Sequence, residues 1–141
     1  MDTANDARFV MRHGAIQLTI AMLLGIPLVA QAPRSRQWMG LHVTVMVGSL
    51  VGLVTALLWS HLRLGAKAQA ALKWLSVGNG YLGIALGSAA TLLGLPGPVT
   101  GTGQPFDASL MAAFGPGFGI LGLTGIAWAA LLAFGLRGKA T

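Results

Sequence analysis

The chain has 141 residues, of which 55% are hydrophobic and only 9% are charged. An ordinary soluble domain carries about 25% charged residues, so this composition excludes that class and predicts one integral membrane domain over residues 1–141. The net charge of +6 comes from basic residues at the ends of apolar segments. They form no stripe interleaved with aromatics, so nucleic acid is not an expected partner. The absence of cysteine excludes disulfides and thiolate metal ligands.

Four apolar segments follow one another, and each is long enough for a bilayer, which takes roughly 20 helical residues. They predict helices at about 13–32, 38–62, 70–95 and 107–136, preceded by a polar leader. The fourth segment is interrupted by Gly115-Pro116-Gly117, where a kink in the helix is expected. The sequence therefore predicts an all-α fold: a four-helix transmembrane bundle surrounded by the lipid bilayer.

The basic residues set the expected orientation of this bundle. Two of them, Arg34 and Arg36, lie at one end of the predicted helices. The other seven lie at the end that holds both termini: Arg8, Arg12, Arg63, Lys67, Lys73, Arg137 and Lys139. Because cytoplasmic loops carry an excess of Lys and Arg, both termini are expected in the cytoplasm. The corresponding location is a bacterial inner membrane.

His42 is the polar residue that fits its surroundings least. It lies about one turn inside the second apolar segment, where an imidazole is unfavourable unless something binds it. Two interpretations remain open. The ring either reaches headgroup water, or it is an axial ligand to a haem iron, for which neutral imidazole is the usual ligand. Zinc is less favoured because no second ligand lies at a suitable spacing.

Asp107, Tyr81, Arg34 and Arg36 are further candidates. Asp107 begins the fourth helix, where it either caps free N–H groups or acts as an acid or base near His42. Arg34 and Arg36 lie at the same membrane face and could pair with haem propionates. Tyr81 lies within the third helix and is a candidate for orienting a substrate oxygen.

Three other polar residues of the apolar segments are interpreted structurally. His13 and His61 lie near the cytoplasmic boundary, where ordinary interfacial histidines are expected. Asn79 lies within the third helix, where a buried amide usually finds a hydrogen bond to a neighbouring helix.

Short motifs recur near the helix ends: His13-Gly14, Trp38-x-x-x-His42, Leu57-Leu58-Trp59, Leu62-Arg63-Leu64, Trp74-Leu75 and Asp107-Ala108. Together they span nearly the whole chain and resemble two related families of small four-helix membrane isomerases. Hydroxylaminobenzene mutase converts an arylhydroxylamine to an aminophenol. Styrene oxide isomerase converts an aryl epoxide to an aldehyde. Gly40-Leu41-His42 and the later motifs resemble the mutase more closely, although that family has Glu where this chain has Asp107.

The resemblance implies a homotrimer that carries haem b at its subunit contacts, with His42 as the axial ligand and metal-binding residue. It also implies a small aromatic substrate. Gly48 occupies the place of an asparagine of the epoxide isomerase, six residues after the histidine, and is expected beside the cofactor. Gly83 and Gly87 occupy the places of a second asparagine and of a tyrosine. These departures put the substrate in doubt.

The leading functional hypothesis is a haem b-dependent isomerase of the mutase type, in which ferric iron acts as a Lewis acid. Its catalytic candidates are His42, Asp107 and Tyr81. Epoxide isomerisation is an alternative within the same chemistry. A non-catalytic haem-binding or structural membrane protein is the alternative from another class, because both family asparagines are replaced by glycine.

Overall fold

A computed structural model describes residues 3–29, 35–94 and 108–137 of the chain. Its four long helices are α1 (Thr3–Leu24), α3 (Ser35–Leu57), α4 (Ala66–Leu93) and α5 (Ala108–Gly135). A short helix, α2 (Ile26–Val29), follows α1, and a 3-10 turn, η1 (Trp59–His61), follows α3. The described residues contain no strand, which confirms the predicted all-α class with four long helices.

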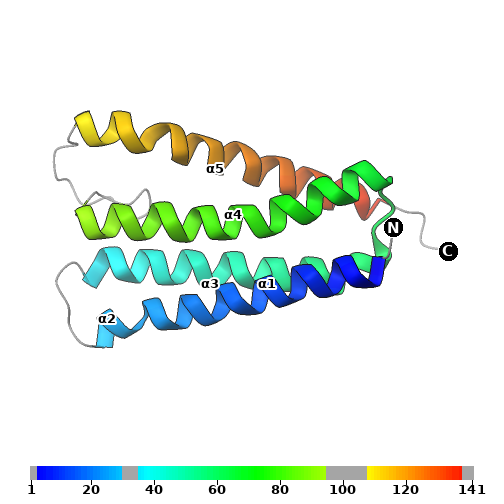
Figure 1. Ribbon diagram of the computed structural model, residues 1–141, viewed down its shortest axis with the longest axis horizontal. Coiled ribbons are helices and arrows are strands. Elements are labelled where there is room, and N and C mark those ends of the chain that lie inside the picture. Colours follow the sequence, from blue (N-terminus) through cyan, green and yellow to red (C-terminus); the bar gives the residue numbers. More distant parts are fainter. Residues whose placement is uncertain (1–2, 30–34, 95–107, 138–141) are drawn as a thin grey trace.

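The long helices lie side by side in one bundle, and consecutive ones run antiparallel (Figure 1). α1 packs mainly against α3 and also touches α4, while α4 lies between α3 and α5. The beginning of α1 and the end of α5 therefore lie at one end of the bundle. The beginnings of α3 and α5 lie at the other end (Figure 1).

The predicted polar leader is wrong, because α1 begins at Thr3 rather than near residue 13. Tertiary contacts explain the longer helix. Val10 is 1% exposed within a buried cluster, and Asp6 forms an ion pair with Lys73 of α4 at 2.7 Å. An apolar residue and a charge four positions apart thus face the bundle together. The first three turns of α1 are part of the packed structure.

The fourth helix is one element that passes through the predicted kink site at Pro116. α5 continues from Ala108 to Gly135 with Pro116 inside it. A proline removes one backbone hydrogen bond, and helices in apolar surroundings tolerate this where neighbouring groups or local adjustment compensate. The helix that covers one side of α4 is therefore a single element of 28 residues.

Two of the described helices, α3 and α5, contain stretches long and apolar enough to cross a membrane, at Arg36–Leu57 and Ala112–Gly135. In the most apolar 18-residue part of α5 no residue is buried within the chain. Leu123 and Ile126 are 71% and 69% exposed. Large apolar side chains on an outer face are typical of contact with lipid or with another subunit. These helices fit a membrane protein.

Gly80 of α4 lies against the side chain of Gln17 in α1. A Cβ atom at Gly80 would overlap the amide of Gln17, which is 2% exposed and donates from Nε2 to the Val77 carbonyl at 3.0 Å. Gly80→Ala is therefore expected to lower the free energy of unfolding by about 1–3 kcal/mol through overpacking. Thermal unfolding in detergent measures this, with Gly78→Ala as the control because a Cβ there meets nothing within 4 Å. Equal stability of the two variants would contradict the close approach.

Candidate functional site

His42 lies on the second turn of α3, toward the end of the bundle opposite the start of α1. Its Nδ1 is 2.7 Å from the carbonyl oxygen of Ala21 in α1. A carbonyl can only accept, so Nδ1 carries the proton and donates. In the neutral ring, Nε2 then keeps its lone pair. A histidine whose second nitrogen is tied to a backbone carbonyl is the usual arrangement of a metal-ligating imidazole.

The Ala21 carbonyl accepts this bond because α1 ends beside it. α1 stops at Leu24, and the N–H of Gly25 donates to Met22 at 3.1 Å instead of to Ala21, its α-helical acceptor. Gly25 also leaves room for the ring, since a Cβ there would lie 3.2 Å from both Cε1 and Nδ1 of His42. The broken turn and the missing side chain together form a seat for the imidazole. Sequence reasoning did not identify this role of Gly25.

The residues around His42 fit a cofactor that brings most of its own ligands. Within the described part of the chain, no group of three or more His, Cys, Asp or Glu side chains could hold a metal ion. One oriented imidazole is enough for an iron that a porphyrin already surrounds. Arg36 is exposed and precedes His42 by six residues, about 9 Å along α3. Arg34 and Asp107 lie outside the described residues.

Tyr81 contacts His13 rather than His42. Its hydroxyl is 3.0 Å from His13 Nδ1, and the two rings meet edge to face at 5.7 Å between centroids. His13 precedes Ala21 by eight residues, which is about 12 Å along α1. The structure therefore does not bring Tyr81 to the His42 seat. It also gives His13 a specific partner that sequence reasoning missed.

The same end of α1 and α4 holds an ion pair enclosed by aromatic rings. Lys73 Nζ contacts Asp6 Oδ1 at 2.7 Å and lies 5.5 Å from the ring of Phe9 and 5.6 Å from that of Trp74. Both charged side chains are largely covered, with 21% of Lys73 and 13% of Asp6 exposed. The ion pair and the Phe9 contact join α1 to α4, whereas Trp74 lies beside Lys73 on α4, so this cluster has a structural role. His61, by contrast, is exposed.

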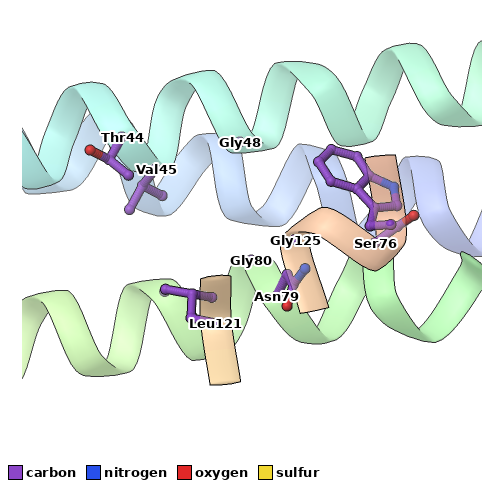
Figure 2. A pocket seen from close by; sticks show the side chains of 10 residues that line it. Thr44, Val45, Gly48, Ser76, Asn79, Gly80, Leu121 and Gly125 are labelled. Atoms are coloured by element: carbon purple, nitrogen blue, oxygen red, sulfur yellow. The ribbon is translucent and has the colours of Figure 1, made fainter. Parts of the chain in front are cut away.

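A cavity of about 210 Å³ lies between α3, α4 and α5 (Figure 2). It is lined by Thr44, Val45, Gly48, Ser76, Asn79, Gly80, Gly83, Leu121, Gly125 and Trp128. Gly48 lies about 120° around α3 from His42, so His42 and the cavity occupy different faces of this helix. The structure thus places Gly48 on the cavity and not on the His42 side of α3. Gly83 opens into the same cavity, whereas Gly87 is packed against Leu41.

Asn79 makes the interhelical hydrogen bond that the sequence predicts. The hydroxyl of Thr124 in α5 donates to Asn79 Oδ1 at 2.5 Å. Its partner could not be named from the sequence, because several hydroxyl residues lie in the neighbouring segments. The bond joins α4 to α5 at the wall of the cavity, which makes Asn79 the amide side chain of this site.

Comparison with known proteins identifies the family. No curated protein and no solved structure matches the chain. A family model described as styrene oxide isomerase matches residues 6–137, which include all of α3, α4 and α5 and nearly all of α1. The match covers nearly the entire sequence and confirms the resemblance seen in the short motifs near the helix ends. The chain therefore belongs to the styrene oxide isomerase family.

Proposed function

We propose that this protein is a haem b-dependent membrane isomerase that rearranges a small aromatic epoxide to an aldehyde. The family match favours isomerase chemistry of the styrene oxide isomerase type. The observation that carries the haem assignment is the hydrogen bond from His42 Nδ1 to the Ala21 carbonyl. It keeps the proton on Nδ1 and leaves Nε2 as a neutral nitrogen ligand.

The chain's own residues would hold and orient the reactants. His42 Nε2 would ligate the iron, and Arg36, with Arg34 before it, would pair with the propionates. Bound haem b would supply a Lewis-acidic ferric iron, and the isomerisation needs no net oxidation or reduction. The apolar walls of the cavity would keep water from a developing carbocation.

The resemblance implies a homotrimer, and the geometry of α3 favours a cofactor site shared between subunits. Because His42 and the cavity lie about 120° apart on the helix, one cofactor that reaches both would lie between two subunits. The unburied apolar stretch of α5 offers an outer face for such contacts. Native mass spectrometry of the purified protein tests the trimer.

Spectra and product analysis test the function. We expect a Soret band in the purified protein and phenylacetaldehyde as the product from styrene oxide. Phenylhydroxylamine is the second substrate to assay, because Gly40-Leu41-His42 resembles the mutase more closely. Conversion of phenylhydroxylamine to an aminophenol, with no turnover of the epoxide, would reassign the enzyme to the mutase type. A pure protein with no Soret band and no product would leave a structural role.

The proposed membrane topology has four spans with both termini in the cytoplasm. The chain has no cysteine, so single introduced cysteines report their location without background. An impermeant thiol reagent added to intact cells should label Ser35→Cys, at the start of α3, and should not label Gly65→Cys, before α4. Labelling of Gly65→Cys alone would invert the orientation, and labelling of neither would remove the span between them.

A further inference from the structure

The cavity between α3, α4 and α5 has the size of one aromatic ring with a short substituent. Its volume is about 210 Å³. An apolar protein cavity of about 150 Å³ accepts benzene, whereas sites for drug-sized ligands begin near 300 Å³. Glycines and apolar side chains form most of its walls. The space therefore suits a monocyclic aromatic molecule.

Two polar groups of this cavity still have a hydrogen to donate: the amide of Asn79, and Nε1 of Trp128, which is buried and has no hydrogen-bond partner among the described residues. Asn79 Oδ1 accepts from the Thr124 hydroxyl at 2.5 Å, and the Ile120 carbonyl, 2.7 Å from the same hydroxyl, shares that hydrogen. This pairing leaves Asn79 Nδ2 to donate. Figure 2 shows the amide nitrogen of Asn79 directed toward α5 near Gly125. Gly125 of α5 borders the Asn79 amide, and a Cβ atom at Gly125 would lie 4.0 Å from Nδ2.

The two hydroxyl groups of the cavity cannot take the role of Asn79. Thr44 donates to the carbonyl of Gly40 at 2.8 Å, and Ser76 donates to the carbonyl of Leu72 at 2.7 Å. Each hydroxyl has one hydrogen, which its own helix already uses. An amide N–H in apolar surroundings is unfavourable until an acceptor reaches it. The Asn79 amide and Trp128 Nε1 thus lack an acceptor, and an oxygen of a ligand can bring one.

We propose that this cavity binds the aromatic ring of the ligand and that Asn79 Nδ2 donates a hydrogen bond to the ligand's oxygen. Thr124 is then the positioning residue, because its hydroxyl holds Oδ1 and so fixes the direction of Nδ2. The identity of this ligand as the substrate rests on the proposed isomerase function. The binding site itself rests on the cavity and its donor.

Gly48 and Gly83 set the size limit of the ligand. A Cβ at Gly48 meets nothing within 4 Å, and one at Gly83 meets only the methyl groups of Leu121, at 3.9 and 4.0 Å. A methyl group at either position would displace no protein atom, and a longer side chain at Gly48 would extend into the cavity that Gly48 lines. Gly48→Leu is therefore a cavity-filling variant, and Gly119→Leu is its matched control. Gly119 also has open space around it but does not line the cavity.

Two unreactive probes of nearly equal shape test the proposal: acetophenone, which carries an oxygen acceptor, and α-methylstyrene, which carries a methylene instead. Binding to the full chain in nanodiscs is measured by saturation-transfer NMR, with empty nanodiscs as the reference for partition into lipid. We expect the wild type to bind acetophenone about fivefold to tenfold more tightly, as one hydrogen bond provides. Asn79→Leu should abolish this preference. Thr124→Val should reduce it, and Thr124→Ser should restore it.

Gly48→Leu should weaken the binding of both probes, whereas Gly119→Leu should leave both unchanged. A preference for acetophenone that survives Asn79→Leu would overturn the donor, and equal effects of the two leucine variants would overturn the cavity. Binding no stronger than to empty nanodiscs would mean that an acyl chain or another subunit fills the space. That result also overturns the proposal. The Soret band is recorded in parallel, so a failed haem assignment and a failed ligand site are distinguished.

Discussion

Replacement of His42 by alanine is expected to remove haem binding and isomerase activity together. His42 Nε2 is the one nitrogen of the seat that a metal could use, because Nδ1 donates to Ala21. The described residues contain no cluster that could replace it. Loss of the ligand should abolish the Soret band of the purified protein and lower activity by at least about a hundredfold.

His13→Ala and His61→Ala are the matched controls for this experiment. His13 contacts Tyr81, about 12 Å along α1 from the Ala21 carbonyl, and His61 is exposed beyond the end of α3. Both variants should keep the wild-type Soret band. If His42→Ala purifies with full haem content and an unchanged spectrum, the ligand assignment is wrong. If His13→Ala loses the band instead, the cofactor lies at the other end of the bundle.

The helices were predictable from the sequence because apolar runs of this length have few alternatives. The error at the beginning of α1 arose from long-range pairing. Asp6 is a polar residue by composition, and it becomes part of the bundle through Lys73, 67 residues later in the chain. Pro116 lies inside α5, as the predicted helix at 107–136 requires, because a proline in apolar surroundings need not end a helix.

Within the candidate site, the sequence identified only a residue whose polarity conflicts with its apolar segment. His42 stood out because an imidazole in an apolar segment needs a partner. Its acceptor did not stand out, because Ala21 contributes only a backbone carbonyl and Gly25 contributes only the lack of a side chain. The cavity follows from helix packing, which places α3, α4 and α5 around one space.

Because His42 and the cavity lie on different faces of α3, a single chain is not expected to bring an iron on His42 into contact with a substrate in the cavity. Asn79 faces the space between α3, α4 and α5, whereas His42 faces α1. A substrate in the cavity of one chain and an iron on His42 of the same chain would be divided by the body of α3. Two copies that meet along their outer faces remove this obstacle. Catalysis in the isolated monomer is therefore not expected, and oligomeric state and activity should be lost together.

Gly25→Val is expected to displace the imidazole ring of His42 although His42 itself is not substituted. The valine Cβ would lie 3.2 Å from Cε1 and Nδ1, and its methyl groups would need space that the ring now occupies. The ring should move off the Ala21 carbonyl, and Nδ1–H would lose the acceptor that fixes its tautomer. Loss of such an outer hydrogen bond typically weakens metal binding by about 10–100-fold. Titration of haem into the apoprotein, followed at the Soret band, measures the change.

Gly65→Val is the control, because Gly65 is exposed, has extended backbone angles and has nothing within 4 Å of a Cβ atom. Gly25→Ala should give an intermediate effect, since one methyl group requires a shift of only a few tenths of an ångström. The order of haem affinities should therefore be wild type and Gly65→Val, then Gly25→Ala, then Gly25→Val. Strain in the helix break alone would lower the stability of the Gly25 variants and leave their haem affinity unchanged. That outcome would show that Gly25 does not position His42 for haem binding. It would also contradict a role of the Ala21 carbonyl in the proposed haem site.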